Sequence, residues 1–361
     1  MKLGIVGMPN AGKTALFNSL TRSGAKSGIS PFSTKESNVG SVVVPDPRLY
    51  KLGEMYKSKE IVHAGIEFLD IAGLVRGSGK GEGLGNKFLA SIRESDALVH
   101  VVRCFDDDNV MHVDGSIDPV RDMETVNFEL IFADMEQLER RYVKQQKAAK
   151  ADKSAALEIA VLEKLQAALE AGQPVRSMSL NKDEQALVSM FGLLTAKPVI
   201  YALNVDEDSL TGGNGYSAAA LEFLKNENSE TFLISAKLEE EMVDFDDKEK
   251  AAMLADMGIS ETGLDRVITT SYRTLGLMSF LTAGPKASRA WTIPLNTKAP
   301  AAAGKIHSDI ERGFIRAEIV NFDSLMDKGS YQAAKEAGLV RLEGKEYIVN
   351  EGDVILFRFN V

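Results

Sequence analysis

The residues from Gly7 to Thr14 read G-M-P-N-A-G-K-T, which matches the phosphate-binding pattern G-x-x-x-x-G-K-[ST]. In such a loop the glycines let successive backbone N–H groups point at a phosphate, and the lysine neutralises the β- and γ-phosphate oxygens. The hydroxyl of the last residue is a ligand for Mg²⁺. The pattern therefore predicts a nucleoside triphosphate site with these candidate binding residues: Asn10, Ala11, Gly12, Lys13, Thr14 and Ala15.

Two further segments could complete the metal and γ-phosphate site. Asp70-Ile71-Ala72-Gly73 follows an apolar run, so that Asp70 can hold a metal-bound water while the Gly73 amide reaches the γ-phosphate. Thr34 lies in the loop between the first helix and the next strand, where a threonine would give Mg²⁺ a second hydroxyl. We predict Thr14, Thr34 and Asp70 as metal ligands, and an ordinary loop residue is the alternative for Thr34.

The residue after Gly73 is Leu74, where a hydrolysing GTPase of the Ras type has a glutamine that orients the attacking water. A leucine side chain cannot form a hydrogen bond, so either intrinsic hydrolysis is slow or another group positions the water. Glycine then occurs at every second position from 77 to 85. Such a segment could order around a γ-phosphate.

The candidate base site is Asn204-Val205-Asp206-Glu207, at the position where guanine-reading proteins carry N/T-K-x-D. The lysine is replaced by Val205 and the aspartate by Glu207. A lost charged hydrogen bond costs about 1.5–3 kcal/mol, so guanine preference should weaken. Asn204 can pair with the N6/N7 edge of adenine, but a purine choice stays open because Glu207 could still reach guanine. Ser235 and Ala236 follow the next strand as a supporting loop that does not discriminate.

These motifs need a sheet whose strands end at one edge. Five apolar runs follow the first one at Leu3 to Val6, separated by helical or loop segments, which predicts a doubly wound α/β fold with a mostly parallel sheet. The runs are Gly40 to Val44, Gly65 to Leu69, Ala97 to Val102, Lys197 to Leu203 and Thr231 to Ile234.

Two regions depart from this alternation. Apolar residues at helical spacing around Ile131 to Tyr142 and around Leu162 to Leu169 predict an antiparallel helical pair inserted at 128–195, with ordinary helices packed on the core as the alternative. After Leu275 we expect a small α+β domain. It would contain an Ala- and Pro-rich loop near Lys298 to Ala303 and a β-hairpin from Tyr347 to Phe357.

Length and composition limit the number of domains and the classes of protein to which this chain can belong. The chain has 361 residues, 44% of them apolar, which suits two or three buried cores. Its 42 basic and 52 acidic side chains give a net charge of −10, which excludes a surface that binds polyphosphate throughout. The single cysteine, Cys104, excludes an intramolecular disulfide and is expected to be an inert core thiol. No apolar stretch approaches the roughly 18 residues of a membrane span, so we expect a cytoplasmic protein without membrane contact.

One segment runs against the acidic balance. Lys286 to Arg316 holds six basic and two acidic side chains, a local charge of +4, which marks a candidate RNA-binding surface. Trp291 and Phe314 lie within it and could stack on bases, although packing in the core is the favoured alternative.

Taken together, these features resemble the Obg-like ATPase family known as YchF over the whole length. The matching segments are Gly7 to Thr14, Pro31 to Thr34, Asp70 to Lys87 with its Leu74, Asn204 to Glu207, and Ala302 to Phe314. The resemblance implies an ATP-preferring, Mg²⁺-dependent hydrolase that binds the ribosome or its large subunit, and we expect a monomer. It further implies a nucleotide-binding domain at 1–127 and 196–277, the helical insertion at 128–195, and a TGS domain of β-grasp type at 278–361.

The resemblance also assigns roles to single residues. His112 matches a mobile-loop histidine that helps to orient water in place of the missing glutamine, and a solvated loop histidine is the alternative. The candidate catalytic residues are thus Lys13, Gly73 and His112. Phe105 matches an aromatic residue that flanks adenine, with a core phenylalanine as the alternative. Asn10 resembles a potassium-binding asparagine of cation-activated relatives, which implies K⁺ as a possible activator, although such an asparagine often only caps its own loop.

Three functions remain open on the residues. The leading hypothesis is a slow Mg²⁺-dependent ATPase that cycles on the ribosome as a translation-linked regulator. The second is a GTPase of the same fold. The third is a nucleotide-gated binding adaptor in which hydrolysis is incidental, and Leu74 is the feature that favours it.

Overall fold

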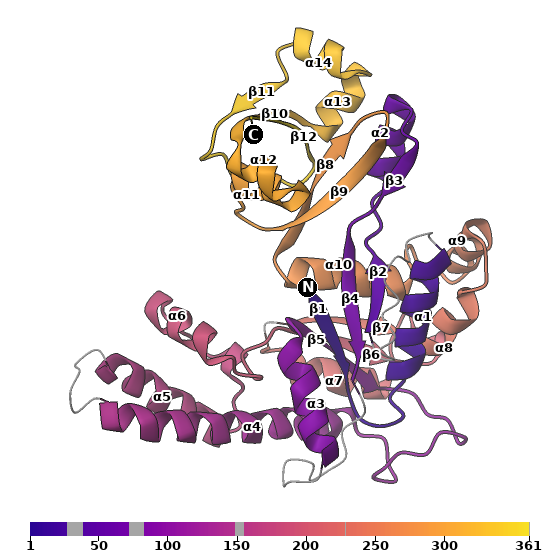
Figure 1. The fold of residues 1–361 in the computed structure, drawn as a ribbon. Coiled ribbons are helices and arrows are strands. Elements are labelled where there is room, and N and C mark those ends of the chain that lie inside the picture. Colours follow the sequence, from indigo (N-terminus) through magenta and orange to yellow (C-terminus); the bar gives the residue numbers. More distant parts are fainter. Residues whose placement is uncertain (27–38, 72–82, 149–154, 228, 361) are drawn as a thin grey trace. The chain divides into compact units, whose positions relative to one another are not determined.

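The computed structural model describes residues 1–26, 39–71, 83–148, 155–227 and 229–360. The chain divides into two compact units (Figure 1). The first comprises Met1–Ser41 and Glu67–Val267, and the second comprises Val42–Ile66 and Ile268–Val361. The predicted nucleotide-binding motifs all belong to the first unit.

The first unit is built on a six-stranded sheet of order β2-β4-β1-β5-β6-β7. Neighbouring strands from β4 to β7 in that order run parallel. Their carboxyl ends therefore meet at one edge, where open α/β sheets bind ligands. The strands are β1 (Lys2–Val6), β2 (Val39–Val43), β4 (Gly65–Asp70), β5 (Ala97–Arg103), β6 (Val199–Asn204) and β7 (Glu230–Ile234). The predicted doubly wound α/β fold is confirmed, and all six predicted strands are present within a few residues of the expected bounds.

Helices pack on this sheet because their apolar faces share a core with it. Residues of α3, α4 and α7 form one buried cluster with residues of β1, β5 and β6, while α1 packs against α8. The helices of this part are α1 (Lys13–Lys26), α3 (Gly83–Glu94), α7 (Gly215–Leu224), α8 (Ala236–Met242), α9 (Asp247–Asp256) and α10 (Gly263–Thr274), with a 3₁₀ turn η2 (Glu207–Ser209).

The predicted helical pair is present as α4 (Pro119–Ala148) and α5 (Ala155–Glu170). Ile131, Leu138, Leu162 and Leu165 are buried in one cluster between them, as the apolar spacing predicts. The helix α4 begins nine residues before the expected start at 128, so its first turns belong to the core of the sheet. A turn η1 (Val175–Ser177) and the helix α6 (Lys182–Phe191) return the chain to β6.

The second unit has a mixed sheet of order β11-β10-β12-β8-β9-β3. Its strands are β3 (Glu60–Val62), β8 (Leu277–Ala283), β9 (Ala287–Pro294), β10 (Phe314–Asn321), β11 (Arg341–Glu343) and β12 (Asp353–Phe359). At the centre β8 and β12 run parallel, and β9 and β10 flank them antiparallel. Helix α11 (Ala299–Ile306) buries Ala299, Ala302 and Ala303 on this sheet. This is the β-grasp arrangement. The other helices are α2 (Arg48–Tyr56), α12 (Ser308–Arg312), α13 (Phe322–Lys328) and α14 (Tyr331–Glu336).

Three local predictions for this unit were wrong. Residues 347–357 form no hairpin, because β12 pairs with β10 and β8 instead. The expected loop at Lys298 to Ala303 is largely helix α11, since Pro300 fits a first helical turn and alanine is the best helix former. Finally, residues 42–66 pack with the C-terminal unit rather than with the nucleotide-binding domain, because β3 pairs with β9.

Among the described helices, none is at once long and apolar enough to cross a membrane.

Candidate functional site

The loop between β1 and α1 is held in a conformation that requires its glycines. Gly7 and Gly12 have φ values of 147° and 100°, and Asn10 has 62°, so the backbone turns repeatedly through conformations that favour glycine. A Cβ atom on Gly7 would lie 2.3 Å from the carbonyl oxygen of Val101, and one on Gly12 would lie 2.3 Å from Nδ2 of Asn204. The close packing of this loop on β5 and β6 therefore leaves no room for side chains at the two glycines.

Lys13 is 7% exposed and donates a hydrogen bond of 2.7 Å from Nζ to the carbonyl oxygen of Met8. The amine thus folds back over the loop that precedes it. Burial lowers the pKa of Lys13 to about 8, and the negative charge of Asp70 opposes that shift. An anion bound in the loop would supply the charge that the buried ammonium group lacks.

Thr14 and Asp70 meet at the other side of the loop. The hydroxyl of Thr14 donates to Oδ2 of Asp70 over 3.4 Å. Burial raises the pKa of Asp70, and the Lys13 charge and this hydrogen bond oppose the shift. Adjacent oxygen ligands of an octahedral Mg²⁺ lie about 3 Å apart, so the hydroxyl and the carboxylate fit that ion by spacing and by donor chemistry. The structure brings together Lys13 and Thr14 of α1 and Asp70 of β4.

Thr34, Gly73, Leu74 and the start of the glycine-rich segment lie outside the described residues. Ala15 follows Thr14 in the first turn of α1, and Ala11 is buried at 1% exposure in the loop.

Asn204 is 4% exposed and ties the phosphate loop to the base-side loop. Its Nδ2 donates to the carbonyl oxygen of Ala11 over 2.9 Å, and its Oδ1 accepts from the backbone N–H of Ala236 over 2.9 Å. The two bonds use one hydrogen and one lone pair of the amide, so one of each is left over. In this arrangement Asn204 first of all joins the two loops of the site.

The rest of the base-side segment is also largely engaged in the fold. Val205 and Ala236 are 2% exposed, and the Ser235 hydroxyl accepts from the N–H of Leu238 as the N-cap of α8. Glu207 is partly exposed and lies 4.0 Å from Nζ of Lys237. These contacts fix the position of the segment beside the phosphate loop.

The loop after β5 is attached to the phosphate loop through Asn10. Its Nδ2 donates to the carbonyl oxygen of Met111 over 2.9 Å, while its Oδ1 has no hydrogen-bond partner in the described part of the chain. An amide oxygen is a ligand type that K⁺ accepts. The next residue along the loop, His112, is therefore linked to the phosphate site by one peptide.

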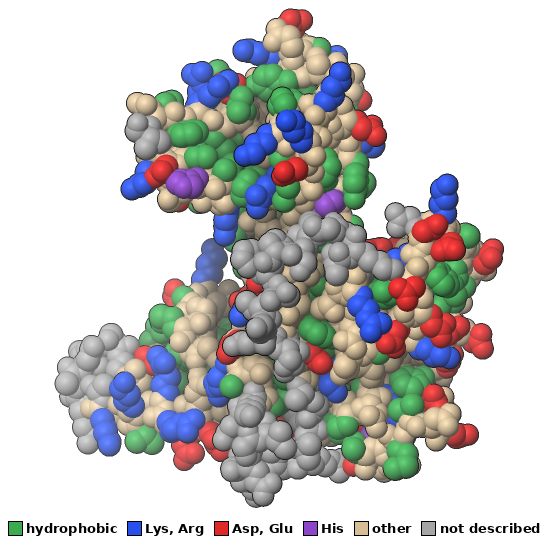
Figure 2. Space-filling view, turned by 45° about the vertical axis from the view of Figure 1, so that its right-hand side comes forward, with side chains coloured by type: hydrophobic (Ala, Val, Ile, Leu, Met, Phe, Trp, Pro, Cys, Tyr) green, Lys and Arg blue, Asp and Glu red, His purple; other side chains and the backbone are tan. Residues whose placement is uncertain are grey.

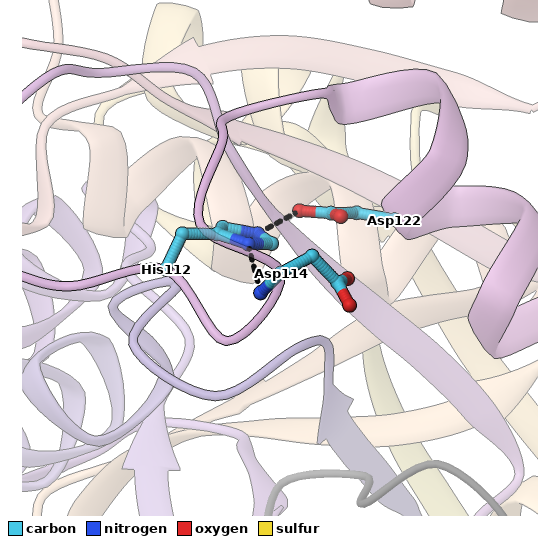
Figure 3. A group of neighbouring side chains, drawn as sticks. All are labelled: His112, Asp114 and Asp122. Carbon is cyan, nitrogen blue, oxygen red and sulfur yellow. Dashed lines mark hydrogen bonds and ion pairs between the residues drawn. The ribbon is translucent and has the colours of Figure 1, made fainter.

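His112 is buried, with 3% of its side chain exposed, so the alternative of a solvated loop residue was wrong. Its Nε2 lies 2.8 Å from Oδ2 of Asp122, and its Nδ1 accepts from the backbone N–H of Asp114 over 3.1 Å (Figure 3). Because Nδ1 accepts, the ring proton is on Nε2 and is donated to the carboxylate. Both nitrogens are occupied, so this arrangement does not offer His112 to a water molecule.

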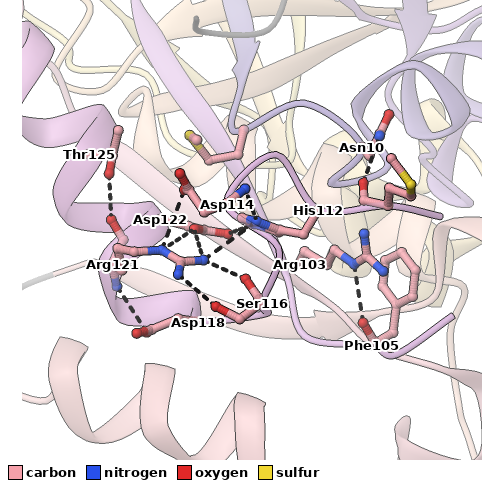
Figure 4. A network of polar contacts seen from close by, with 12 residues as sticks. Asn10, Arg103, Phe105, His112, Asp114, Ser116, Asp118, Arg121, Asp122 and Thr125 are labelled. Atoms are coloured by element: carbon pink, nitrogen blue, oxygen red, sulfur yellow. Dashed lines mark hydrogen bonds and ion pairs between the residues drawn. The ribbon is translucent and has the colours of Figure 1, made fainter. Parts of the chain in front are cut away.

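Arg121 completes this network (Figure 4). Its Nη2 lies 3.3 Å from Oδ1 of Asp122, and its Nε lies 3.6 Å from Oδ2 of Asp114. His112, Asp114 and Asp122 present ligand atoms close together, but the arginine already supplies a cation to both carboxylates. We therefore interpret the group as an ion-pair network that holds the loop, rather than as a metal centre.

Phe105 is partly buried, and the guanidinium carbon of Arg103 lies 4.6 Å from the centre of its ring. Cys104 is completely buried, and burial raises the pKa of its thiol to about 12. The expectation of an inert thiol agrees with that environment.

Sequence reasoning missed Arg103 and Asp122. Asp122 lies ten positions after His112, in the first turn of α4, and no motif marks it. Arg103 ends a buried strand in which His100 is the only other polar residue, and a charged side chain at the ligand-binding edge was the available signal.

In the second unit, the basic segment from Lys286 to Arg316 is partly neutralised. Lys298 pairs with Glu346 over 2.6 Å, Arg312 pairs with Asp309, and Arg316 lies 3.6 Å from Glu318. Figure 2 shows Lys and Arg side chains interspersed with hydrophobic ones on the visible face of this unit, in the upper part of the view.

The two aromatic residues of this segment belong to the fold. Phe314 is 6% exposed and lies in the core. Trp291 packs against that core, and its Nε1 donates to the hydroxyl of Thr282 over 2.9 Å. The outer side of Trp291 faces Arg289, whose guanidinium carbon lies 4.0 Å from the ring centre.

Two family models match the sequence. MMR_HSR1, described as a 50S ribosome-binding GTPase, matches residues 2–133. YchF-GTPase_C, described as a protein of unknown function (DUF933), matches residues 277–360.

Curated relatives match over the full length. The Ribosome-binding ATPase YchF of Bacillus subtilis (strain 168) is 51% identical over 361 residues, which cover 99% of this chain and 99% of that protein. The protein of the same name from Escherichia coli O157:H7 is 46% identical and covers 100% and 99%.

Solved structures agree with these relatives. The Schizosaccharomyces pombe YchF GTPase superposes with a TM-score of 0.90 at 35% identity, and the match covers 99% of this chain and 97% of that one. A GTP binding protein from Pyrococcus horikoshii OT3 has a TM-score of 0.63 at 18% identity over both full chains, which shows a shared fold.

Proposed function

Because this chain belongs to the YchF family of ribosome-binding P-loop ATPases, we propose that it hydrolyses Mg²⁺-bound ATP to ADP and phosphate in association with the ribosome. The observation that carries this proposal is the meeting of Lys13, Thr14 and Asp70 around a glycine-dependent loop. A buried ammonium group, a hydroxyl and a carboxylate at these spacings match the needs of a magnesium triphosphate.

The roles of the site residues follow from their chemistry. The backbone N–H groups of the loop and Lys13 bind the β- and γ-phosphates. The Thr14 hydroxyl and Asp70, the latter directly or through water, would hold the Mg²⁺, which neutralises phosphate charge when bound. Thr34 and the Gly73 amide are proposed to complete this shell. Asn204 positions the loop against Ala236, and Phe105 with Val205 forms the base side of the site.

In the hydrolysis step, the oxygen of a water molecule bonds to the γ-phosphorus, and the bond from the γ-phosphorus to the β–γ bridging oxygen breaks with its electron pair left on ADP. The water gives up one proton, and inorganic phosphate forms. We propose that His112 orients this water once the hydrogen bond between the Asp114 N–H and Nδ1 is broken. Asp122 would then keep the ring proton on Nε2, leaving Nδ1 as the acceptor that faces the water. This reorganisation would make hydrolysis slow in the isolated protein.

The adaptor hypothesis has one structural observation in its favour. Both ring nitrogens of His112 are engaged, so the described conformation supplies no group there to orient water. A protein that stayed in this conformation would bind ATP and signal its presence without turnover. For the choice of base, Val205 in place of a lysine supports ATP over GTP.

The remaining parts of the proposal concern the whole protein. We propose the large ribosomal subunit as the partner, a monomeric state, the cytoplasm as the location, and K⁺ as an activator bound through Oδ1 of Asn10. We also propose nucleotide binding by the first unit outside the helical insertion at 128–195. That insertion and the TGS domain at 278–361, to which residues 42–66 are joined, are proposed as the parts that report the nucleotide state.

Side-by-side dissociation constants for Mg²⁺–ATP and Mg²⁺–GTP, followed by turnover with and without ribosomes, test the function. We expect tighter ATP binding, slow basal turnover and stimulation by ribosomes, and we expect Lys13→Ala to lose most of the triphosphate affinity. Tighter GTP binding would favour the GTPase, and negligible turnover that ribosomes do not change would favour the adaptor.

A further inference from the structure

Arg103 is a buried cation for which the described residues supply no counter-ion. The residue is 2% exposed and is the largest side chain among those fully buried in the described structure. Its Nε donates to the carbonyl oxygen of Phe105 over 3.2 Å, and its Nη1 is buried without a hydrogen-bond partner. In the described part of the chain it forms no ion pair, although three exposed aspartates follow at positions 106–108. Buried charges are normally paired, so this one needs an explanation.

The position of Arg103 supplies the explanation. It is the last residue of β5 and lies in register with Asn204, the last residue of the parallel neighbour β6. Paired residues of neighbouring strands point their side chains to the same face of a sheet. Asn204 reaches the carbonyl oxygen of Ala11 on that face. Arg103 therefore ends on the nucleotide side of the sheet, between the phosphate loop, which follows β1, and the base-side segment.

The surroundings of the guanidinium group suit one chemical class of partner, an anion. One face of the group is covered by the ring of Phe105, as Figure 4 shows. A donor-only group with an unpaired charge is completed by an anion, and the phosphates are the only anionic part of a nucleotide. The neighbouring base motif has Val205 where guanine-reading proteins have a lysine, so Arg103 also restores a cation to this edge of the sheet.

We propose that Arg103 is a nucleotide-binding residue whose charge is compensated by the phosphates of the bound nucleotide. The inference rests on the proposed function, because it needs a nucleotide in this site. It adds a phosphate-compensating cation from β5 to the lysine of the phosphate loop. It also explains why the interior keeps this unpaired guanidinium group. The charge lowers the stability of the free protein, and the phosphates of the bound nucleotide then pair with it.

The test compares Arg103→Met, which keeps an apolar side chain of similar length, with Arg103→Lys, which keeps the charge. The measurements are dissociation constants for ATP and ADP, that for adenosine by competition, and the melting temperature of the nucleotide-free protein. Arg93→Met is the matched control, because Arg93 is an exposed arginine of the same unit.

For Arg103→Met we expect ATP and ADP affinity to fall roughly ten- to hundredfold, as for a lost hydrogen bond to a charged group. Adenosine affinity should stay the same, and the free protein should melt at the same or a higher temperature, because an unpaired buried charge has been removed. Arg103→Lys should recover part of the lost affinity.

Two results would overturn the inference while leaving the proposed function intact. One is unchanged ATP affinity in Arg103→Met. The other is a lowered melting temperature together with an equal loss of affinity for ATP and adenosine, which would make Arg103 a structural support of Phe105. If the unaltered protein failed to bind ATP, the proposed function itself would be wrong, which is a distinguishable outcome.

Discussion

Whether the amine of Lys13 is protonated depends on whether a phosphate is bound beside it. In the free protein its pKa is lowered to about 8 by burial, so the ammonium form predominates below that pH and is lost above it. A bound phosphate stabilises the charged form and raises the pKa. We therefore predict that ATP binding takes up a proton near pH 8 and that ATP affinity weakens as the pH rises through 8.

Calorimetry in two buffers of different ionisation enthalpy measures that proton uptake. Lys13→Arg is the control, since arginine remains charged throughout this range and should show no uptake at this position. A pH-independent affinity between pH 7 and pH 9 in the unaltered protein, with no proton exchanged, would contradict the lowered pKa.

Kinetic measurements can distinguish the roles of His112 and Asp122. If Asp122 holds the ring in its Nε2–H form, both His112→Ala and Asp122→Asn should lower kcat about 10- to 100-fold without changing ATP affinity, because the proposed mechanism gives both residues a role toward the water and none in binding the nucleotide. Single-turnover measurements with separately determined dissociation constants check this. Asp108→Asn, an exposed change in the same loop, should leave both quantities unaltered.

An unchanged kcat in His112→Ala would remove this histidine from the mechanism. A loss in His112→Ala that Asp122→Asn does not share would instead leave the histidine in place and assign Asp122 to loop stability alone.

The residues that the sequence could locate are those that a motif or a strand end marks. Lys13 and Thr14 lie in one contiguous motif, and Asp70 ends the strand β4, which neighbours β1, so the motif and the strand pattern together predict their meeting. The contact of Asn204 with Ala11 spans 193 positions, and that of His112 depends on Asp122, ten positions away, which no motif marks. Their burial could be seen only in the folded chain.

At the scale of secondary-structure elements, Asp134 fixes the return of the helical insertion to the sheet. It lies on α4 with no exposed surface. Its carboxylate accepts the backbone N–H groups of Leu194 and Thr195 over 2.9 and 2.7 Å and the Thr195 hydroxyl over 2.7 Å. These bonds join the middle of α4 to the segment that leads into β6.

We predict that Asp134→Ala lowers the free energy of unfolding by about 3–5 kcal/mol, because it leaves buried donors without an acceptor. Equilibrium denaturation in urea measures the change. Glu139→Ala on the exposed side of the same helix should change it by less than about 0.5 kcal/mol. Equal effects of the two substitutions would show that the three hydrogen bonds do not stabilise the fold.

The elements themselves were predictable to different degrees for a physical reason. The strands β1, β4, β5 and β6 are nearly continuous apolar runs, because central strands of a parallel sheet are buried on both faces. In contrast, β3 has three residues and is a strand only because β9 offers it an edge. The partner of β12 was likewise set by tertiary pairing, which overrode the local turn signal at Gly352.

At the scale of the whole molecule, the proposed ribosome contact depends on charge in the second unit. Arg316 is a poor probe, because Glu318 also pairs with Arg358 and a reversed charge would disturb both contacts. Lys305 and Arg312 lie on short helices and are exposed. The double variant Lys305→Glu, Arg312→Glu is therefore the sharper test of this surface.

We predict that this double variant weakens co-sedimentation with ribosomes and lowers the salt dependence of binding by about two units of slope, as for two lost phosphate contacts. ATP turnover without ribosomes should be unchanged. Lys335→Glu on α14 introduces a comparable exposed change and should have no effect. If the double variant and the control sediment equally, this surface does not bind RNA.

The C-terminal sheet is completed by a strand encoded more than two hundred positions earlier. Residues 42–66 supply β3 to the edge of β9, and Arg48 of α2 pairs with Glu351. A fragment that begins at 277 would still contain the segment that the C-terminal family model matches. Without β3, however, it would leave the edge of β9 unpaired, and an unpaired strand edge favours self-association. A chimera between relatives must therefore exchange residues 42–66 together with the C-terminal segment, because two separate parts of the sequence encode this one domain.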